Sequence, residues 1–342
     1  MENLASNEMS SSRPTLVVVR DESDPSQDCL LDLANLARFQ VVADSGLAEV
    51  IDEAEILFVW PFRVPTLRSA WERAVKLRWI HTATAGVDGL IFKELQMSDV
   101  AVTNSRGVFE VAIAEYTLGL LLAFAKDLHT TLRLQDQRRW LHRETAGLQG
   151  AQLLVVGAGP IGREVGILAK HFGMAVEIIA RHRRENDPTW GLVRGIDELH
   201  AALGRADYVV VATPLTQETK GLINAAAIDA MKPGARIINV GRGAVLDERA
   251  VLAGLESNHL GGAALDVFEE EPLPLDHPFW SRSDVIVSPH MSADLVGWQR
   301  MVTAGFAENL RRFRAGEELL NRVDKQSGYG MSRVASSGSR ET

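Results

Sequence analysis

The feature that most constrains the fold is a recurrence of short apolar runs separated by segments of helical periodicity. Such runs, rich in Val, Ile and Ala and bounded by Gly, Pro or Asp, predict strands that are buried on both faces. Strands that alternate with helices predict parallel sheets built from βαβ units. An early series covers residues 15–19, 39–42, 56–60, 77–82 and 100–104, and a later series covers 152–157, 175–181, 207–213, 235–241, 262–268 and 285–290.

The two series predict an α/β protein with two doubly wound domains, Rossmann-like or flavodoxin-like, and a cleft between them. The six later runs match a dinucleotide-binding domain, expected over residues 104–291 and opened by a helix over 109–128. A helix expected over 294–315 follows the last strand and is expected to return to the first domain. The substrate domain is then discontinuous, with residues 15–103 and 292–327. Polar residues 1–14 and the Ser-, Gly- and Arg-rich residues 328–342 predict disordered tails.

Composition excludes several classes of function. The 342 residues carry 36 Lys and Arg against 45 Asp and Glu, a net charge of −9 that does not suit a nucleic-acid binder. The longest apolar run, residues 116–125, is too short to span a membrane. The single cysteine, Cys29, excludes an intrachain disulfide and any zinc site that needs two thiolates, and no metal site is predicted. A reducing cytoplasm fits this cysteine usage.

A glycine-rich motif, VVGAGPIG, connects an expected strand to an expected helix. In such a motif the first glycine permits a tight turn, the second lets the backbone approach a pyrophosphate, and the third lets the helix pack closely on the strand. A proline suits the first helical turn, and the helix N-terminus attracts phosphate. The predicted cofactor-binding residues of this loop are Gly157, Gly159, Pro160, Ile161 and Gly162.

The end of the next expected strand indicates which dinucleotide binds. NAD sites usually carry Asp or Glu there, hydrogen-bonded to the ribose 2′-hydroxyl. This chain has Arg181, His182, Arg183 and Arg184 instead. Because guanidinium groups bind a 2′-phosphate, Arg181 and Arg184 predict a preference for NADP(H), while use of NAD(H) stays open. The alternative is a solvated basic turn.

Polar side chains follow three of the later strands, at the sheet edge where a cofactor would present its reactive ring. Arg242 lies between two glycines in NVGRG, Asp266 and Glu271 lie in ALDVFEEEPLP, and His290 ends IVSPH. Each alone has an ordinary structural explanation, such as an ion pair or a surface acid. Together with the glycine loop they predict a catalytic site.

At this point the chain resembles the D-isomer-specific 2-hydroxyacid dehydrogenases, and among them the NADPH-dependent glyoxylate/hydroxypyruvate reductases. The resemblance runs over about residues 56–329 and includes the glycine loop and the NVGRG, LDVF, EPLP and SPH segments in order. It implies a catalytic triad of Arg242, Glu271 and His290. It also implies a carboxylate-binding turn at Ala85 and Gly86 in TATAGVD. The further cofactor contacts that it implies are Thr213, Pro214, Val240, Gly241 and Asp266.

The expected chemistry follows from the residue types. Reduction of a 2-keto acid needs a hydride, a proton and neutralisation of a carboxylate. His290 can supply the proton as general acid, with Glu271 orienting its ring. Arg242 can bind the carboxylate and polarise the carbonyl group, and the backbone N–H groups at Ala85 and Gly86 can hold the other carboxylate oxygen.

The substrate is predicted least sharply. Trp60 and Phe62 follow a strand of the first domain, and Met291 and Trp298 follow His290, so each can wall the pocket or simply pack in a core. We expect a small acid, glyoxylate or hydroxypyruvate, with a bulkier 2-keto acid as an alternative. A non-catalytic NAD(P)H-sensing or corepressor-like protein on the same fold is the second class of hypothesis. The apolar helix at residues 116–125 predicts a homodimer.

Overall fold

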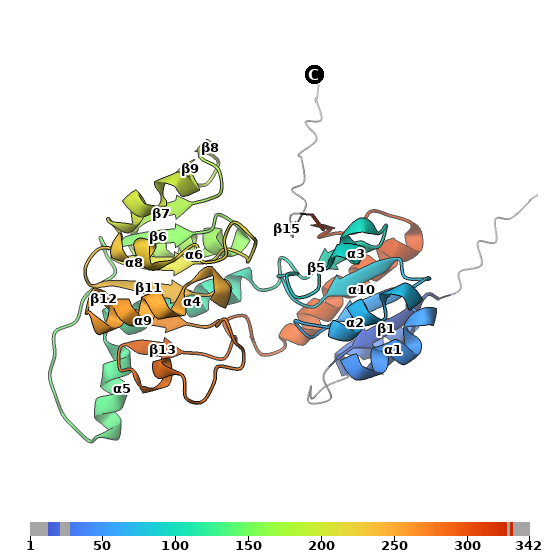
Figure 1. Ribbon diagram of the computed structural model, residues 1–342, viewed down its shortest axis with the longest axis horizontal. Helices are drawn as coiled ribbons and strands as arrows, with labels where there is room; N and C mark the ends of the chain where they lie inside the picture. The colour runs from blue at the N-terminus through green and yellow to red at the C-terminus, as the bar shows by residue number, and fades with distance from the viewer. Residues whose placement is uncertain (1–12, 21–27, 327–328, 331–342) are drawn as a thin grey trace, which may run out of the picture. The chain divides into compact units, whose positions relative to one another are not determined.

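The computed structural model describes residues 13–20, 28–326 and 329–330 (Figure 1). It divides into two compact units. The first unit holds the described residues up to Val108 and from Gly297 onward, and the second unit is Phe109–Val296. Both junctions lie slightly beyond the expected 103/104 and 291/292. Residues after Asn104 still bond to the first unit, since the Ser105 hydroxyl donates to the Thr82 carbonyl at 3.0 Å. Residues after Met291 still bond to the second unit, since the Ser292 N–H donates to the Asp266 carboxylate at 3.0 Å.

The first unit is a five-stranded parallel sheet with the order β2-β1-β3-β4-β5. Its strands are β1 (Thr15–Val19), β2 (Arg38–Val42), β3 (Ile56–Val59), β4 (Trp79–Thr82) and β5 (Ala101–Asn104). Side chains alternate between the two faces of each strand. Val17, Leu57 and Ile80 pack with α1 (Leu47–Val50), α2 (Pro65–Ser69) and α3 (Lys93–Met97).

The opposite face of this sheet packs on α10 (Trp298–Ala315). Phe306 of this helix stacks on Phe58 and on Trp79, with ring centroids 4.2 and 5.0 Å apart. The expected helix over 294–315 is therefore corrected at its start. Gly297, at φ 84°, is in the left-handed region, so the helix begins only after it.

The second unit is a six-stranded parallel sheet with the order β13-β12-β11-β10-β6-β7. Its strands are β6 (Gln152–Val156), β7 (Ala175–Ile179), β10 (Tyr208–Val211), β11 (Ala235–Asn239), β12 (Leu260–Leu265) and β13 (Val285–Val287). Helices α4 (Glu110–Ala125) and α6 (Pro160–His171) pack together on one face. Helices α7 (Leu199–Leu203), α8 (Ala225–Asp229) and α9 (Glu248–Glu256) share a core with the other. The predicted fold class, two parallel-sheet α/β domains, is confirmed.

Three elements of the second unit differ from expectation. The helix expected over 109–128 ends at Ala125, because Asp127 is left-handed at φ 48°, and α5 (Leu128–Asp136) follows. A hairpin of β8 (Arg184–Asp187) and β9 (Gly191–Val193) is additional. Arg194, directly after it, forms a parallel bridge with Ile179 and so adds a short segment beside β7.

The predicted tails are partly ordered. The Arg13 guanidinium donates to the Ala34 carbonyl, and the Pro14 carbonyl accepts from the Arg38 N–H. At the other end β15 (Tyr329–Gly330) pairs with β14 (Val323–Asp324). The remainder of both predicted tails lies outside the described residues. Within the described part of the chain, no helix combines the length and apolar character needed to cross a bilayer.

Candidate active site

The register of the second sheet brings the predicted site residues to one edge. Val156, Val211, Asn239, Leu265 and Val287 are level with one another across five neighbouring strands. The loops that leave these strands at their carboxyl ends therefore start side by side. These loops carry the glycine motif and the segments of Arg242, Asp266 and His290.

The glycine loop has the geometry of a phosphate-binding turn. Gly157 is at φ 123°, and a Cβ there would lie 2.6 Å from the Ala212 carbonyl oxygen. A Cβ on Gly162 would overlap the Gly157 carbonyl oxygen, so close packing of α6 on β6 requires this glycine. Gly159 is the N-cap of α6 and Pro160 follows it. A Cβ on Gly159 would meet no protein atom within 4 Å, so the fold itself does not require glycine there and a bound pyrophosphate would.

The loops after β10 and β11 lie against this turn. A Cβ on Gly241 would be 2.6 Å from the Thr213 carbonyl oxygen, and the Thr213 nitrogen is 3.0 Å from the Cβ position of Gly157. Val240, 5% exposed, extends the same edge. The Pro214 carbonyl accepts from the Thr219 hydroxyl, which fixes the loop after β10. The residues predicted to contact the cofactor in the glycine loop, at Thr213 and at Gly241 are thus adjacent to one another. Their arrangement fits an extended dinucleotide.

The predicted arginines follow β7, which ends at Ile179 and not at Arg181 as expected. Arg181 pairs with Glu218 at 3.0 Å. Arg184 lies 3.8 Å from the buried carboxylate of Asp187, whose main partner is Arg163. The Arg163 guanidinium outweighs burial and holds the pKa of Asp187 well below its ordinary value. A 2′-phosphate at this place would compete with carboxylates for both predicted arginines.

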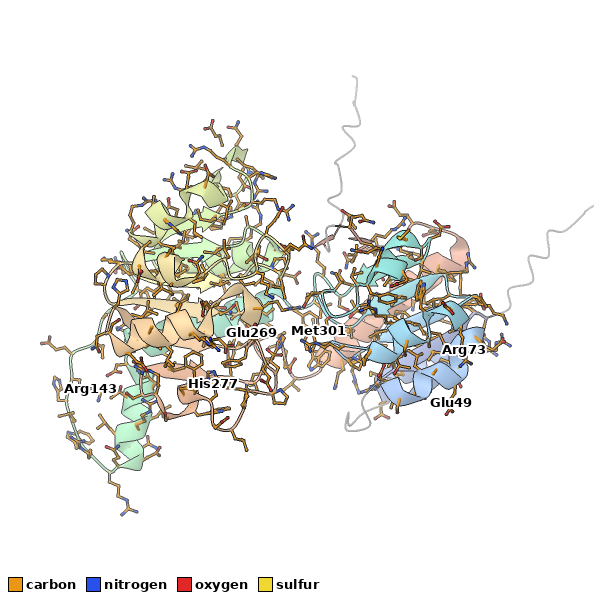
Figure 2. The ribbon with its side chains drawn as sticks, viewed as in Figure 1. Glu49, Arg73, Arg143, Glu269, His277 and Met301 are labelled. Atoms are coloured by element: carbon orange, nitrogen blue, oxygen red, sulfur yellow. The ribbon has the colours of Figure 1, made fainter. Side chains whose placement is uncertain are left out.

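His290 and Glu271 meet as the sequence predicts. Nδ1 of His290 lies 2.9 Å from Oε2 of Glu271, and the other carboxylate oxygen accepts from the Phe268 N–H, also at 2.9 Å. The adjacent acids Glu269 (labelled in Figure 2), Glu270 and Glu271 are all exposed, but it is the Glu271 carboxylate that makes this pair. The ring of His290 is thereby oriented by a carboxylate that the backbone itself holds.

The charges around Glu271 act on its ionisation. Burial by itself raises the pKa of this carboxyl, but the hydrogen bonds from His290 and the Phe268 N–H, with the charges of His290 and Arg242, lower it by more. Glu271 is therefore ionised over a wider pH range than an ordinary glutamate. An ionised Glu271 is an acceptor for the hydrogen bond at Nδ1 of His290 and so orients the ring.

Arg242 is fixed at its backbone and its side chain. The Asn239 amide donates to the Arg242 carbonyl at 3.1 Å, and Nη1 of Arg242 donates to the Gly241 carbonyl at 2.8 Å. A Cβ on Gly243 would overlap the backbone of Phe268, so the turn after Arg242 packs directly on the segment that leads to Glu271. Arg242, Glu271 and His290 are in this way brought together in the second unit.

Asp266 is fully buried and holds the loop that carries His290. Its two carboxylate oxygens accept from the Ser288 hydroxyl at 2.7 Å and from the N–H groups of Met291 and Ser292 at 3.0 Å. Its carbonyl accepts from the His290 N–H at 2.8 Å. The sequence predicts Asp266 only as a cofactor contact, and its role in holding this loop is not apparent there.

The predicted carboxylate-binding turn lies in the first unit, directly after β4. The Ala85 carbonyl accepts from the Asn104 amide, and the Gly86 carbonyl accepts from the Thr84 hydroxyl, both at 2.6 Å. Trp60 is only 7% exposed and packs against Trp298 and under the Arg20 guanidinium. In the first unit Trp60 is thus mainly a core residue, and Phe62, 48% exposed, presents more aromatic surface.

Known proteins are similar to this chain in sequence and in fold. Residues 118–292 match the family model of the D-isomer specific 2-hydroxyacid dehydrogenase, NAD binding domain. A D-3-phosphoglycerate dehydrogenase from Methanocaldococcus jannaschii is 32% identical over 81% of this chain, which spans only 53% of that relative's length. A glyoxylate reductase from Pyrococcus horikoshii is also 32% identical, over 73% of this chain and 77% of its own.

A similar solved structure is the NADPH-dependent glyoxylate/hydroxypyruvate reductase from Sinorhizobium meliloti, in complex with NADP and sulfate. It is 25% identical, covers 93% of this chain and 100% of its own, and has a TM-score of 0.81. The sequence matches and the two parallel sheets lead to the same assignment. The chain belongs to the D-isomer specific 2-hydroxyacid dehydrogenase family.

Proposed function

We propose that this protein reduces a small 2-keto acid, glyoxylate or hydroxypyruvate, to the D-2-hydroxy acid with NADPH. The observation that carries the proposal is the pair of His290 Nδ1 and Glu271 Oε2, 2.9 Å apart at the same sheet edge as Arg242 and the glycine loop. The oriented imidazole can provide a proton, and the fixed guanidinium can bind an anion. The glycine loop can hold the dinucleotide that carries the hydride.

The glycine loop would hold the cofactor pyrophosphate at the N-terminus of α6. Support comes from the open Cβ position at Gly159 and from Pro160 at the first turn of the helix. Arg181 and Arg184 would bind the 2′-phosphate, which favours NADP(H), and the Sinorhizobium meliloti relative is described in complex with NADP. The remaining residues that would contact the cofactor are Ile161, Thr213, Pro214, Val240, Gly241 and Asp266. When bound, the reduced nicotinamide supplies the hydride.

The substrate would bind through its carboxylate. Arg242 bridges one carboxylate oxygen and the carbonyl oxygen, because a guanidinium offers several N–H groups in one plane. The N–H groups at Ala85 and Gly86 would donate hydrogen bonds to the other carboxylate oxygen. Positive charge near the carbonyl oxygen stabilises the negative charge that develops there as hydride adds to the carbon.

His290 would complete the reaction as general acid. It donates a proton to the carbonyl oxygen while hydride adds to the carbon, which gives the hydroxyl group of the product. In the reverse direction the same ring accepts the proton. Glu271 keeps the ring oriented and is itself held by the hydrogen bond from the Phe268 N–H.

A bulkier 2-keto acid is the second candidate, because apolar surface is exposed near both predicted halves of the site. Phe62 in the first unit is 48% exposed, and Met291 in the second unit, next to His290, is 43% exposed. Exposed apolar side chains beside polar anchors are typical of ligand sites. Substrate size therefore has to be decided by kinetics.

The test is a panel of 2-keto acids assayed with NADPH and with NADH. We expect kcat/KM to be highest for glyoxylate or hydroxypyruvate with NADPH. Higher kcat/KM for phenylpyruvate would favour the bulkier class, and equal or higher values with NADH would contradict the cofactor assignment. A protein that binds NADPH but reduces none of these acids would contradict the enzymatic proposal.

We also propose that the protein works as a homodimer in the cytoplasm. Part of the apolar surface of α4 packs on α6 of the same chain. Beyond α4, however, large apolar side chains remain exposed on α5 and on the segment that follows it: Leu128, Leu132, Trp140 and Leu141. Exposed apolar groups on one continuous stretch of chain are typical of protein interfaces.

A further inference from the structure

We propose that Asn104 is a positioning residue: its amide fixes the Ala85–Gly86 turn so that the backbone N–H groups face an anionic ligand. The inference rests on the proposed function in one respect, the use of this turn for the substrate carboxylate. Asn104 belongs neither to the glycine motif nor to the predicted catalytic triad of Arg242, Glu271 and His290.

Three successive carbonyl groups of the turn are tied to the first unit. The Thr84 carbonyl accepts from the Ser105 N–H at 3.0 Å. The Ala85 carbonyl accepts from Nδ2 of Asn104 at 2.6 Å, and the Gly86 carbonyl accepts from the Thr84 hydroxyl at 2.6 Å. The orientation of three consecutive peptide groups is therefore set by hydrogen bonds at their oxygens.

In a planar trans peptide the N–H points away from the C=O. Anchoring the carbonyls of residues 84, 85 and 86 therefore turns the N–H groups of Ala85, Gly86 and Val87 the opposite way. Within the described part of the chain, these three N–H groups make no hydrogen bond. Successive outward N–H groups form a concavity that binds anions. Of the three anchors, only that from Asn104 comes from a side chain outside the turn.

Asn104 is itself held firmly. It ends β5, is 6% exposed, and its backbone N–H donates to the Asn321 carbonyl at 3.2 Å. Its side-chain oxygen accepts from the Arg106 N–H at 3.3 Å. The Asn321 amide in turn donates to the Arg106 carbonyl at 2.6 Å. The amide nitrogen of Asn104 therefore has a defined direction toward Ala85.

The test uses the full chain and the variants Asn104→Ala and Asn104→Asp. We expect the KM for the 2-keto acid and the dissociation constant of oxalate, a small carboxylate probe, to rise roughly tenfold or more. The aspartate variant keeps the shape of the side chain but loses the donor, so it is expected to lose at least as much affinity as the alanine variant. kcat at saturating substrate and the dissociation constant of NADPH are expected to stay close to wild type, because the glycine loop is untouched.

Gln96→Ala is the matched control. It removes another side-chain amide bond to a backbone carbonyl in the same unit, that of Gln96 to Lys325 at 2.9 Å, without touching the turn. We expect it to leave the oxalate affinity unchanged. Thr84→Val, which removes the anchor of the Gly86 carbonyl, is expected to weaken oxalate binding as the Asn104 variants do, and it keeps the test decisive if those variants fold poorly.

Three outcomes separate the claims. Unchanged oxalate affinity in the Asn104 and Thr84 variants, or no oxalate binding by the wild-type protein, overturns the positioning role. Asn104-dependent oxalate binding by a protein that reduces no 2-keto acid overturns the proposed reaction and leaves the positioning role standing. Equal losses in the Gln96 control would show a general effect of destabilisation and would also overturn it.

Discussion

His290 has an unusual backbone conformation for the residue that is proposed to move the proton. Its φ is 54°, in the left-handed region, which costs free energy for a residue other than glycine. The N–H groups of His290, Met291 and Ser292 all donate to Asp266 and hold the loop in this conformation. The conformation directs the imidazole to Glu271, so strain and function coincide at one residue.

His290→Gln is predicted to lower kcat by roughly 10²–10⁴ while NADPH still binds. Glutamine keeps a polar side chain in the loop but supplies no exchangeable proton of suitable acidity. The measurement is steady-state kinetics beside the dissociation constant of NADPH. Turnover near that of the wild-type protein would show that another group or water donates the proton.

The lowered pKa of Glu271 predicts a pH-dependent contribution to stability. A carboxyl whose pKa falls on folding stabilises the folded state above its unfolded value, here 4.5, and this contribution is lost as the pH falls through the lower folded pKa. Because 36% of the side chain is exposed, the effect should be under about 1 kcal/mol.

Unfolding free energies of wild type and Glu271→Gln, measured between about pH 3 and pH 7, check the sign. We expect the wild-type protein to be the more stable above pH 4.5 and the difference to shrink as the pH falls. A difference that grows toward low pH would contradict the assignment of an ionised Glu271.

At the residue scale, the candidate site was predictable where a side chain follows a strand in a recognisable segment. Arg242, Glu271 and His290 are of this kind. The Phe268 N–H that fixes Glu271, the loop-holding bonds of Asp266 and the anchor from Asn104 to Ala85 were not predictable. They depend on strand register and on which carbonyl faces which side chain, and neither leaves a periodic signal in the sequence.

Among the elements, α6 and its glycine loop offer a test that separates folding from ligand binding. We predict that Gly162→Ala destabilises the second unit, because its Cβ would overlap the Gly157 carbonyl, whereas Gly159→Ala folds with stability near wild type. Gly159→Ala is nonetheless expected to weaken NADPH binding at least tenfold, because its methyl group points where a pyrophosphate would approach.

Thermal unfolding without cofactor and titration with NADPH measure the two effects separately. Gly119→Ala serves as a control, since a Cβ there also meets no protein atom within 4 Å and the residue belongs to α4 and not to the glycine loop. Normal NADPH affinity in Gly159→Ala would contradict the role of this turn.

The elements that were not predicted from the sequence have local causes. The break between α4 and α5 follows from Asp127, whose carboxylate accepts from Arg143 and whose φ is 48°, in a stretch of otherwise good helix formers. Strand β8 is polar and largely exposed, and β9 has only three residues, so neither shows the longer apolar run that identified the other strands. The buried strands were predictable because a strand that is buried on both faces has a run of consecutive apolar residues.

At the scale of the whole molecule, the two units share one feature of strand order. In each sheet the chain reverses its direction of winding beside the first strand, between β1 and β3 in one and between β6 and β10 in the other. Loops at the carboxyl ends of such strands diverge and leave room for ligands. The turn after β4 and the loops after β6, β11 and β13 are all at carboxyl ends, which is why strand order predicts their function better than local propensity does.

The last prediction concerns assembly. The segment between α5 and β6 carries Trp140, whose side chain is fully exposed, and Leu141, which is 51% exposed; Arg143, labelled in Figure 2, marks its course. Burial of an exposed indole lowers the free energy, so we expect a second copy of the chain to cover it. Trp140→Asp with Leu141→Asp is predicted to convert a dimer to a monomer in sedimentation velocity, whereas Val75→Asp, at another exposed apolar residue in the first unit, should not. A wild-type chain that sediments as a monomer at micromolar concentration would contradict the homodimer, and a dimer that survives the double substitution would place its interface elsewhere.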